Sequence, residues 1–370
     1  MLTSLDDSLW HQLPTTFDHV GTSDPRFFDR YWFAFYAPDG SAAAQVTMGA
    51  YRNMNVLDAA AVVIVDGRQY NVRASRELGR EIVTRCGPLG VEVVEPLQRF
   101  ALNLDAGSHL QGQVHWTARV PPHEERPHFQ RQRARVTEDY QRFDQIGVAT
   151  GWLEVAGTRI DINRWWACRD HSWGVRPRMG IREPATGAPE PLEHRGYVLA
   201  FLFFSTDTLA GHVLLSGREG EARYTTGAVR EIASGREWSI SGAALAVTVH
   251  AGTRRFRSAT LSTQLDDGQE LVFVAQANGA AIAMQGLGYS GGWDDRRGLG
   301  VWRGADHVET DVWDVSAPAR IVYPDGTSNE HWHRIQPVTV AARWGNGTTS
   351  DGYGSMTLVL SGHLPDFGLE

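Results

Sequence analysis

Lysine is missing from the 370-residue sequence, so all 35 basic residues are arginine. This excludes a Schiff-base lysine, a P-loop lysine and a lysine general base. Cysteine is scarce as well, since only Cys86 and Cys168 occur, and two thiols make neither a disulfide framework nor a cysteine-rich zinc site. A strand–turn–helix nucleophile elbow is not expected, because Ser290 is followed by two glycines rather than by a helix. A serine-triad hydrolase therefore has no support.

Positive charge is not in surplus either. The net charge of −8 argues against a nucleic-acid backbone as the main partner. No apolar run approaches the roughly eighteen residues that a membrane-spanning helix needs. The first ten residues lack both the basic and the apolar regions of a signal peptide. A soluble cytoplasmic protein is the expectation.

Short apolar runs separated by turn residues fill most of the chain. Ala60–Val65 and Arg68–Arg73 flank the turn pair Asp66-Gly67, which is a strong hairpin signal. Ile146–Val155 and Arg159–Ala167 flank a second turn and predict another hairpin. Many short strands without alternating helices predict an all-β fold of antiparallel barrels or sandwiches with little helix.

The best candidate for a domain boundary is a proline-rich stretch near the middle of the chain. Residues 182–193 contain Pro184, Pro189 and Pro191 together with a glycine, and strand-like patterns resume after them. The sequence therefore predicts an N-terminal barrel over residues 1–180, a linker over 181–193 and a C-terminal barrel over 194–370.

The segment Arg164–Arg176 ends the second hairpin and concentrates reactive side chains. It holds three tryptophans, three arginines, an aspartate, a histidine and a serine. A carboxylic acid buried among aromatic rings can have a raised pKa and act as a proton donor, which makes Asp170 a candidate acid. The alternative is structural: Asp170 pairs with an arginine, and the tryptophans belong to the core.

Strand geometry limits which of these side chains can meet. In an extended strand, Asp170 and Ser172 point to one face, and Arg169, His171 and Trp173 point to the other. Only one set can line a cavity from a regular strand, unless a bulge or the end of the strand brings in both.

The C-terminal half offers weaker candidates. The glycine-rich stretch from Tyr289 to Trp302 contains Trp293 and Asp294; its acidic pair is an acid–base resource or, more simply, a solvated turn. In the strand pattern of Asp306–Asp314, Glu309 and Asp311 are candidates for a cavity face.

A metal site is not predicted. His331 and His333 share one strand face, but no third ligand accompanies them at a recognisable spacing.

The sequence resembles a known superfamily over residues 145–176. The motif Arg169-Asp170-His171-Ser172-Trp173-Gly174, preceded by Gln145-x-Gly147, Gly151 and the turn at Val155-Ala156-Gly157, resembles the signature of the AttH and carotenoid 1,2-hydratase superfamily. The resemblance implies two tandem lipocalin-like β-barrels, with the signature at the end of the first barrel and facing the junction. It also implies a role in alkene protonation for three residues of the motif, Asp170, His171 and Trp173. Tyr197, Asp207 and Asp294 are candidates for the downstream tyrosine and aspartate that act with them.

The sequence and this resemblance together predict a cofactor-independent hydratase, lyase, isomerase or cyclase. Its substrate would be a small lipophilic molecule of terpenoid or polyketide type, bound in a barrel mouth or at the domain junction. Asp170 would be the general acid, His171 would orient or relay the proton, and Arg169 would set the charge of the acid. Trp173 and Trp166 would stabilise a carbocation by cation–π attraction. The remaining candidates for substrate contact are Tyr197, Tyr289, Trp293 and Asp294.

Two alternatives remain open. The first is a non-catalytic lipophile binder, and the second is a pericyclase that shapes its substrate without an essential acid. No metal or cofactor is expected, and the sequence leaves the oligomeric state open.

Overall fold

The structure, a computed structural model, describes residues 3–9, 11–80, 83–132, 134–180, 196–330 and 333–369. The expected all-β fold is confirmed: every sheet pairing between the described strands is antiparallel, and the described helices are short 3-10 turns. These turns are η1 (Ser4–Asp7), η2 (Arg52–Met54), η3 (Met284–Leu287) and η4 (Pro365–Phe367). None of the described helices is long and apolar enough to cross a membrane.

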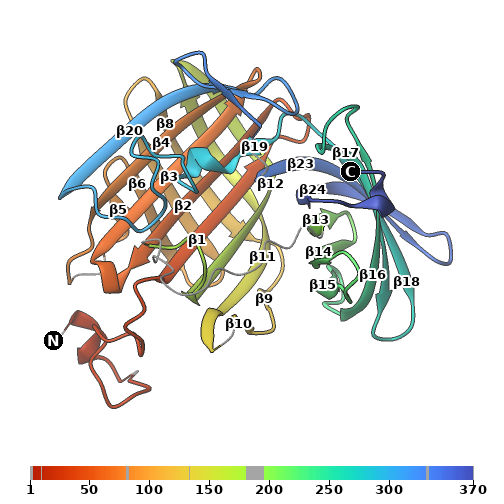
Figure 1. Cartoon of the computed structure of the whole chain (residues 1–370), viewed down its shortest axis with the longest axis horizontal. Coiled ribbons are helices and arrows are strands. Elements are labelled where there is room, and N and C mark those ends of the chain that lie inside the picture. Colours follow the sequence, from red (N-terminus) through yellow and green to blue (C-terminus); the bar gives the residue numbers. More distant parts are fainter. Residues whose placement is uncertain are drawn as a thin grey trace.

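The first unit is a long sheet that curls around its own core (Figure 1). Its central order is β4-β3-β2-β1-β12-β11-β8-β7-β6-β5, and β5 and β6 at the far edge return to contact β3 and β4. Inward-facing side chains such as Phe33, Phe35, Leu102 and Trp116 fill the interior. The strands are β1 (Phe27–Tyr36), β2 (Ala42–Tyr51), β3 (Val56–Val65), β4 (Arg68–Glu77), β5 (Arg85–Cys86), β6 (Leu89–Glu95), β7 (Arg99–Asp105), β8 (Leu110–Ala118), β9 (His123–Glu124), β10 (His128–Gln132), β11 (Arg135–Val155) and β12 (Thr158–Val175).

The second unit is a barrel that closes through the pairing of β18 with β23. Its eight strands alternate apolar and polar residues, and the apolar set, including Leu202, Phe204 and Phe273, forms a separate core. The strands are β13 (Tyr197–Thr206), β14 (Leu209–Arg218), β15 (Tyr224–Glu231), β16 (Glu237–Val249), β17 (Phe256–Leu265), β18 (Glu270–Ala277), β23 (Arg334–Trp344) and β24 (Thr349–Ser361).

One segment from the C-terminal half belongs to the first sheet. After β19 (Ile282–Ala283), the chain leaves the second barrel and runs as β20 (Asp306–Asp314) along β4, with Asp306 opposite Arg76. The short strands β21 (Ile321–Val322) and β22 (Ser328–Asn329) extend that edge. Residues 306–329 of the expected C-terminal barrel thus lie in the first sheet, and the expected linker 181–193 falls outside the described residues.

A third core joins the two units. Because side chains alternate along each strand, the outward residues of β1 to β4, β11 and β12 need cover of their own. The second barrel and the segment around η3 provide it, so that Trp32 and Trp166 pack in one cluster with Phe203, Leu287 and Trp313. The junction between the units is therefore a packed seam.

Candidate functional site

The reactive segment lies in regular strand geometry. From Trp166 to Val175, β12 pairs without interruption with both β1 and β11. Asp170 consequently faces the seam between the units, together with Ser172 and Cys168. Arg169, His171 and Trp173 face the other side. The structure therefore does not bring acid, imidazole and indole into one cavity.

Asp170 has an acidic neighbour that the sequence did not single out. In the sheet, it lies directly between Trp32 of β1 and Asp144 of β11. The Asp170 carboxyl is partly buried and makes no hydrogen bond or ion pair with any side chain that the structure describes. Burial raises the pKa of Asp170, although the charges of Arg142 and Arg176 oppose the shift. The result is an acid without a fixed partner, directly opposite a second acid.

Asp144 lies at the centre of a buried polar cluster. Its Oδ1 is 3.8 Å from Arg142 Nε, and its Oδ2 is 3.8 Å from His212 Nε2 of β14. His212 Nε2 has no hydrogen-bond partner among the described residues, and the Asp144 carboxyl, when protonated, donates a hydrogen bond to Glu125. The neighbouring Glu125 is fully engaged, because Arg142 Nη2 and His128 Nε2 each approach one of its carboxylate oxygens to 2.7 Å.

The environment divides these groups into charged and neutral ones. Burial, followed by the negative charge of Glu125, raises the pKa of Asp144 well above its usual value. Although burial opposes it, the contacts of Glu125 with Arg142 and His128 hold the pKa of Glu125 well below its usual value. Burial lowers the pKa of His212 to about 3, so its imidazole is neutral. These shifts favour a neutral Asp144 carboxyl beside the Glu125–Arg142 ion pair and a neutral His212 imidazole.

Three of these residues could approach a metal ion. The ligand atoms of Glu125, Asp144 and His212 all lie within 4.8 Å of one another. Both oxygens of Glu125 are already taken, however, which leaves two ligands, and the Arg142 guanidinium opposes a divalent cation. The residues present fit proton exchange better than metal binding.

Aromatic rings and a small cavity border the cluster. Trp32 packs against Phe203 with ring centroids 5.9 Å apart, and the rings of Phe201 and Phe203 both contact His212. A cavity of about 20 Å³ lies beside Asp144 and His212. This volume is enough for roughly one water molecule. Asp144 therefore lies beside apolar surface and beside room for a single water molecule.

Arg169 and His171 have partners inside the first barrel. Arg169 is fully buried, donates to Gln145 Oε1 at 2.7 Å and lies over the rings of Phe100, Trp116 and Phe143. His171 Nε2 is 2.7 Å from Asp29 Oδ1, and the His171 ring packs against Tyr31 and Trp173. Trp173 itself is 37% exposed. These three side chains line the interior and mouth of the first barrel.

The other candidates are dispersed over the seam. Trp166 stacks on Tyr36, and Tyr197 is partly buried at the start of β13. Tyr289 lies beneath the guanidinium of Arg30, which is opposite Ser172 in the sheet. Trp293 packs under Arg303, and Asp294 is exposed with its backbone N–H donating to Glu309. Of these residues, Trp166 lies on the same strand and the same face as Asp170. The sequence candidates Glu309 and Asp311 bind Arg73 across the edge of the first sheet.

The cluster residues Glu125, Arg142, Asp144 and His212 were missed, as was Trp32. The sequence did offer a way to find Asp144, because the first strand of the predicted hairpin, which starts at Ile146, can be extended backwards by two residues. The register counted from its turn, however, places Asp144 opposite Arg169, since Val155 pairs with Thr158. An irregularity between Ala149 and Gly151 shifts the register by one residue and places Asp144 opposite Asp170 instead.

The architecture of the chain is that of a two-unit, lipocalin-like β fold. The chain is similar to kievitone hydratase from Nectria haematococca, with a TM-score of 0.50 and 9% identity, over 90% of this chain and 89% of that one. At this identity, the likeness is one of fold. A second solved structure, Pseudomonas putida OprB at low pH, has 10% identity and comparable coverage, but its TM-score of 0.12 carries no argument.

The protein belongs to DUF8625, a family of unknown function, which matches residues 2–368. A search of curated proteins gives no match.

Proposed function

We propose that this protein is an acid–base enzyme that protonates an alkene or a similar group of a lipophilic substrate at the seam between its two units. The observation that carries the proposal is the pairing of Asp170 with Asp144, two directly opposed carboxyls whose pKa values are both raised. A carboxylic acid kept neutral by burial is a competent proton donor. The similarity in fold to a hydratase and the resemblance of the motif to the signature of the AttH superfamily agree with this role.

In the proposed reaction, the Asp170 carboxyl gives its proton to one carbon of the double bond and is left as a carboxylate. The cation formed at the other carbon is captured by water, which then loses a proton, in a hydration, or loses a different proton in an isomerisation. In a cyclisation it is attacked by a second double bond, and the new cation then loses a proton. The proton released in that step returns to Asp170, with Asp144 and neutral His212 as the neighbouring groups able to carry it.

The surroundings of Asp170 favour an apolar substrate of terpenoid or polyketide type. Trp32 lies next to the acid, and the faces of Trp32 and Phe203 can stabilise a developing positive charge by on the order of 1–2 kcal/mol each when desolvated. The cavity beside His212 has room for about one water molecule, which favours hydration or its reversal among the possible outcomes.

The decisive experiment compares the wild type with Asp170→Asn. Lipophilic extracts and a panel of terpenoid and polyketide alkenes are incubated with each protein, and products are identified by mass spectrometry. We expect Asp170→Asn to lose at least about a thousandfold in turnover, in line with removal of an essential general acid, while still binding the substrate. Asp161→Asn is the matched control, because Asp161 is exposed on the same strand. Full turnover by Asp170→Asn would overturn the proposal.

The same experiment separates the two alternative functions. A non-catalytic binder would change its tryptophan fluorescence on adding a lipophile and would yield no product in either form. A pericyclase would keep its turnover in Asp170→Asn and lose it when an aromatic residue of the site is removed, for example in Trp32→Ala.

A further inference from the structure

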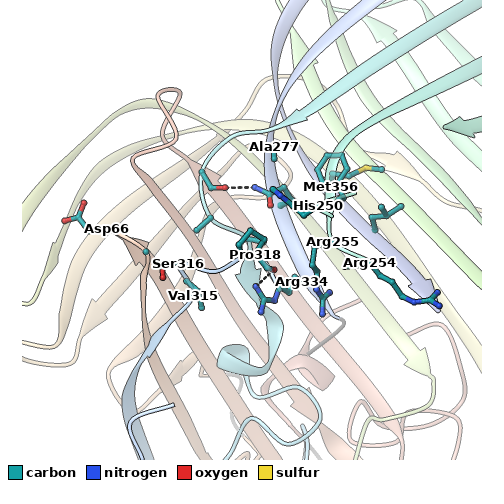
Figure 2. A pocket seen from close by; sticks show the side chains of 17 residues that line it. Asp66, His250, Arg254, Arg255, Ala277, Val315, Ser316, Pro318, Arg334 and Met356 are labelled. Atoms are coloured by element: carbon teal, nitrogen blue, oxygen red, sulfur yellow. Dashed lines mark hydrogen bonds between the residues drawn. The ribbon is translucent and has the colours of Figure 1, made fainter. Parts of the chain in front are cut away.

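A second pocket lies at another part of the seam. It has a volume of about 450 Å³ and opens between the second barrel and the loops that end β3 and β20 (Figure 2). It shares no lining residue with the cluster around Asp144 and Asp170. Its size falls within the usual range of small-molecule sites, roughly 300–1,000 Å³.

The polar wall of this pocket is basic. Arg254, Arg255 and Arg334 line it, whereas Asp66 is the only carboxylate among the described residues that line it. Figure 2 shows Arg255 and Arg334 side by side, with Asp66 at the far end of the pocket. Each of the two neighbouring guanidinium groups therefore faces another positive charge.

Arg334 is the central residue of this wall. It is 4% exposed, yet Nε and Nη2 have no hydrogen-bond partner within the described part of the chain; only Nη1 is engaged, with the backbone oxygens of Ala317 and Pro318. No ion pair is formed by Arg334 with any described carboxylate. Burial, together with the charge of Arg255, lowers the pKa of Arg334 to about 10. The exposed carboxylate of Glu330 acts electrostatically on both Arg255 and Arg334, but it forms no ion pair with Arg334. A buried guanidinium without a direct ion pair is costly unless an anion accompanies it.

The opposite wall is apolar. Phe256, Met356 and Leu358 belong to the core of the second barrel and reach the pocket from inside it. Val315 closes the pocket from the first unit. A ligand that satisfied both walls would carry a negative head at Arg334 and an apolar body against the end of the barrel.

We infer that this pocket binds an amphipathic anion, with its carboxylate or phosphate head on Arg334 and Arg255 and its hydrocarbon part on Phe256, Met356 and Leu358. Arginine presents paired N–H donors that match the geometry of both head groups. The two unpartnered nitrogens of Arg334 are the donors that such a head would use.

Isothermal titration calorimetry of the full chain tests this inference with four probes that share a ten-carbon tail: decanoate, decyl phosphate, decanol and decyltrimethylammonium. We expect one or both anions to bind, with decanol and the cation at least about tenfold weaker, a ratio that corresponds to about 1.4 kcal/mol. The two anionic probes tell a carboxylate head from a phosphate head. Equal binding of decanol, or no binding of either anion, would overturn the inference.

Variants locate the site. Arg334→Met should weaken binding of the anion at least about tenfold, and because it removes a buried, unpaired charge it should fold normally. Arg257→Met is the matched control, since Arg257 is exposed on β17, next to Phe256, and should bind as the wild type does. Ala281→Phe fills the pocket without changing its charge and should also abolish binding. If Arg334→Met and Ala281→Phe both bind as well as the control, the pocket is not the site.

Discussion

At the scale of single residues, the decisive feature is two carboxyls that face each other across neighbouring strands. Like charges directly opposite in a sheet repel each other, and burial adds a desolvation cost for each ion. Burial raises the pKa values of Asp170 and Asp144 and so favours their neutral forms, whereas contacts with Arg142 and His128 lower the pKa of Glu125 and favour its charged form. Environment thus shifts the pKa values of the three carboxyl groups in different directions, which favours proton transfer among them.

The raised pKa of Asp144 predicts how the stability of the folded protein depends on pH. The pKa of Asp144 is raised in the folded state, so its stabilising contribution is complete below its usual pKa of 3.8 and is lost as the pH rises through the folded value. Asparagine does not titrate, so the Asp144→Asn variant does not lose this stability as the pH rises. We expect the variant to become more stable than the wild type as the pH increases from 4 to 8, by about 1.4 kcal/mol for each unit of the native shift.

Urea unfolding at several pH values measures the effect. His212 acts in the opposite sense, because its lowered pKa removes stability as the pH falls below about 6.5. It is present in both proteins, so the difference between them isolates Asp144. Parallel stability curves for the two proteins would contradict the assigned protonation state.

At the scale of elements, one extra residue in β12 decides which acids meet. Asn163 and Arg164 together oppose Thr150, and Arg164 adopts the left-handed region with φ of 53°. Gly151 on the facing strand has φ of 129°, and a Cβ there would lie 2.1 Å from Gln113 O. Gly147 is equally constrained, since a Cβ would be 2.5 Å from the ring of Trp116. The motif glycines are therefore explained by backbone conformation and packing.

A deletion of Arg164 tests the pairing of the two acids beyond the bulge. Without Arg164, Asn163 alone would oppose Thr150, and every pair from Ala149–Trp165 onward, including Asp144–Asp170, would stay as it is. Infrared spectroscopy at neutral pH should therefore show the protonated-carboxyl band of the wild type in the deletion variant as well. Arg164→Gly also keeps the register and should keep the band, with unfolding free energy equal to or up to about 1 kcal/mol above the wild type. Loss of the band in the deletion variant would contradict this account of the register.

At the scale of the whole molecule, the two units are tied by an exchanged segment. β20 comes from the C-terminal half and pairs along the whole length of β4, where Glu309 and Asp311 bind the buried Arg73 (Figure 1). Residues around η3 cover the same face, and Gln69 donates to the backbone oxygen of Ala283. We therefore propose that the division at residues 181–193 separates two units that do not fold independently.

Truncation provides the test. A fragment of residues 1–180 lacks β20 and η3 and leaves Gln69, Asn71 and Arg73 without the cover that buries them. We expect it to show no cooperative thermal transition by circular dichroism, whereas the full chain unfolds in one step. Trp313→Ala opens a cavity in the shared core and should lower the free energy of unfolding of the full chain by about 3–5 kcal/mol. A fragment that melts cooperatively would show that the first unit folds alone.

The sequence by itself determined the all-β class, the hairpin that leads into Arg169–Gly174, and Asp170 as the candidate acid, because alternation and turn residues are local signals. Strand alternation placed His171 and Trp173 on the face opposite Asp170 if the segment stayed extended, and it does; the hypothesis that the three act together needed a departure from this geometry. Only the tertiary structure decided which groups surround the acid. The bulge at Arg164 set the register, β1 brought Trp32, and β14 of the other unit brought His212. These contacts depend on chain segments distant in sequence, and a shift of one residue in any pairing would have reversed the face on which each side chain lies.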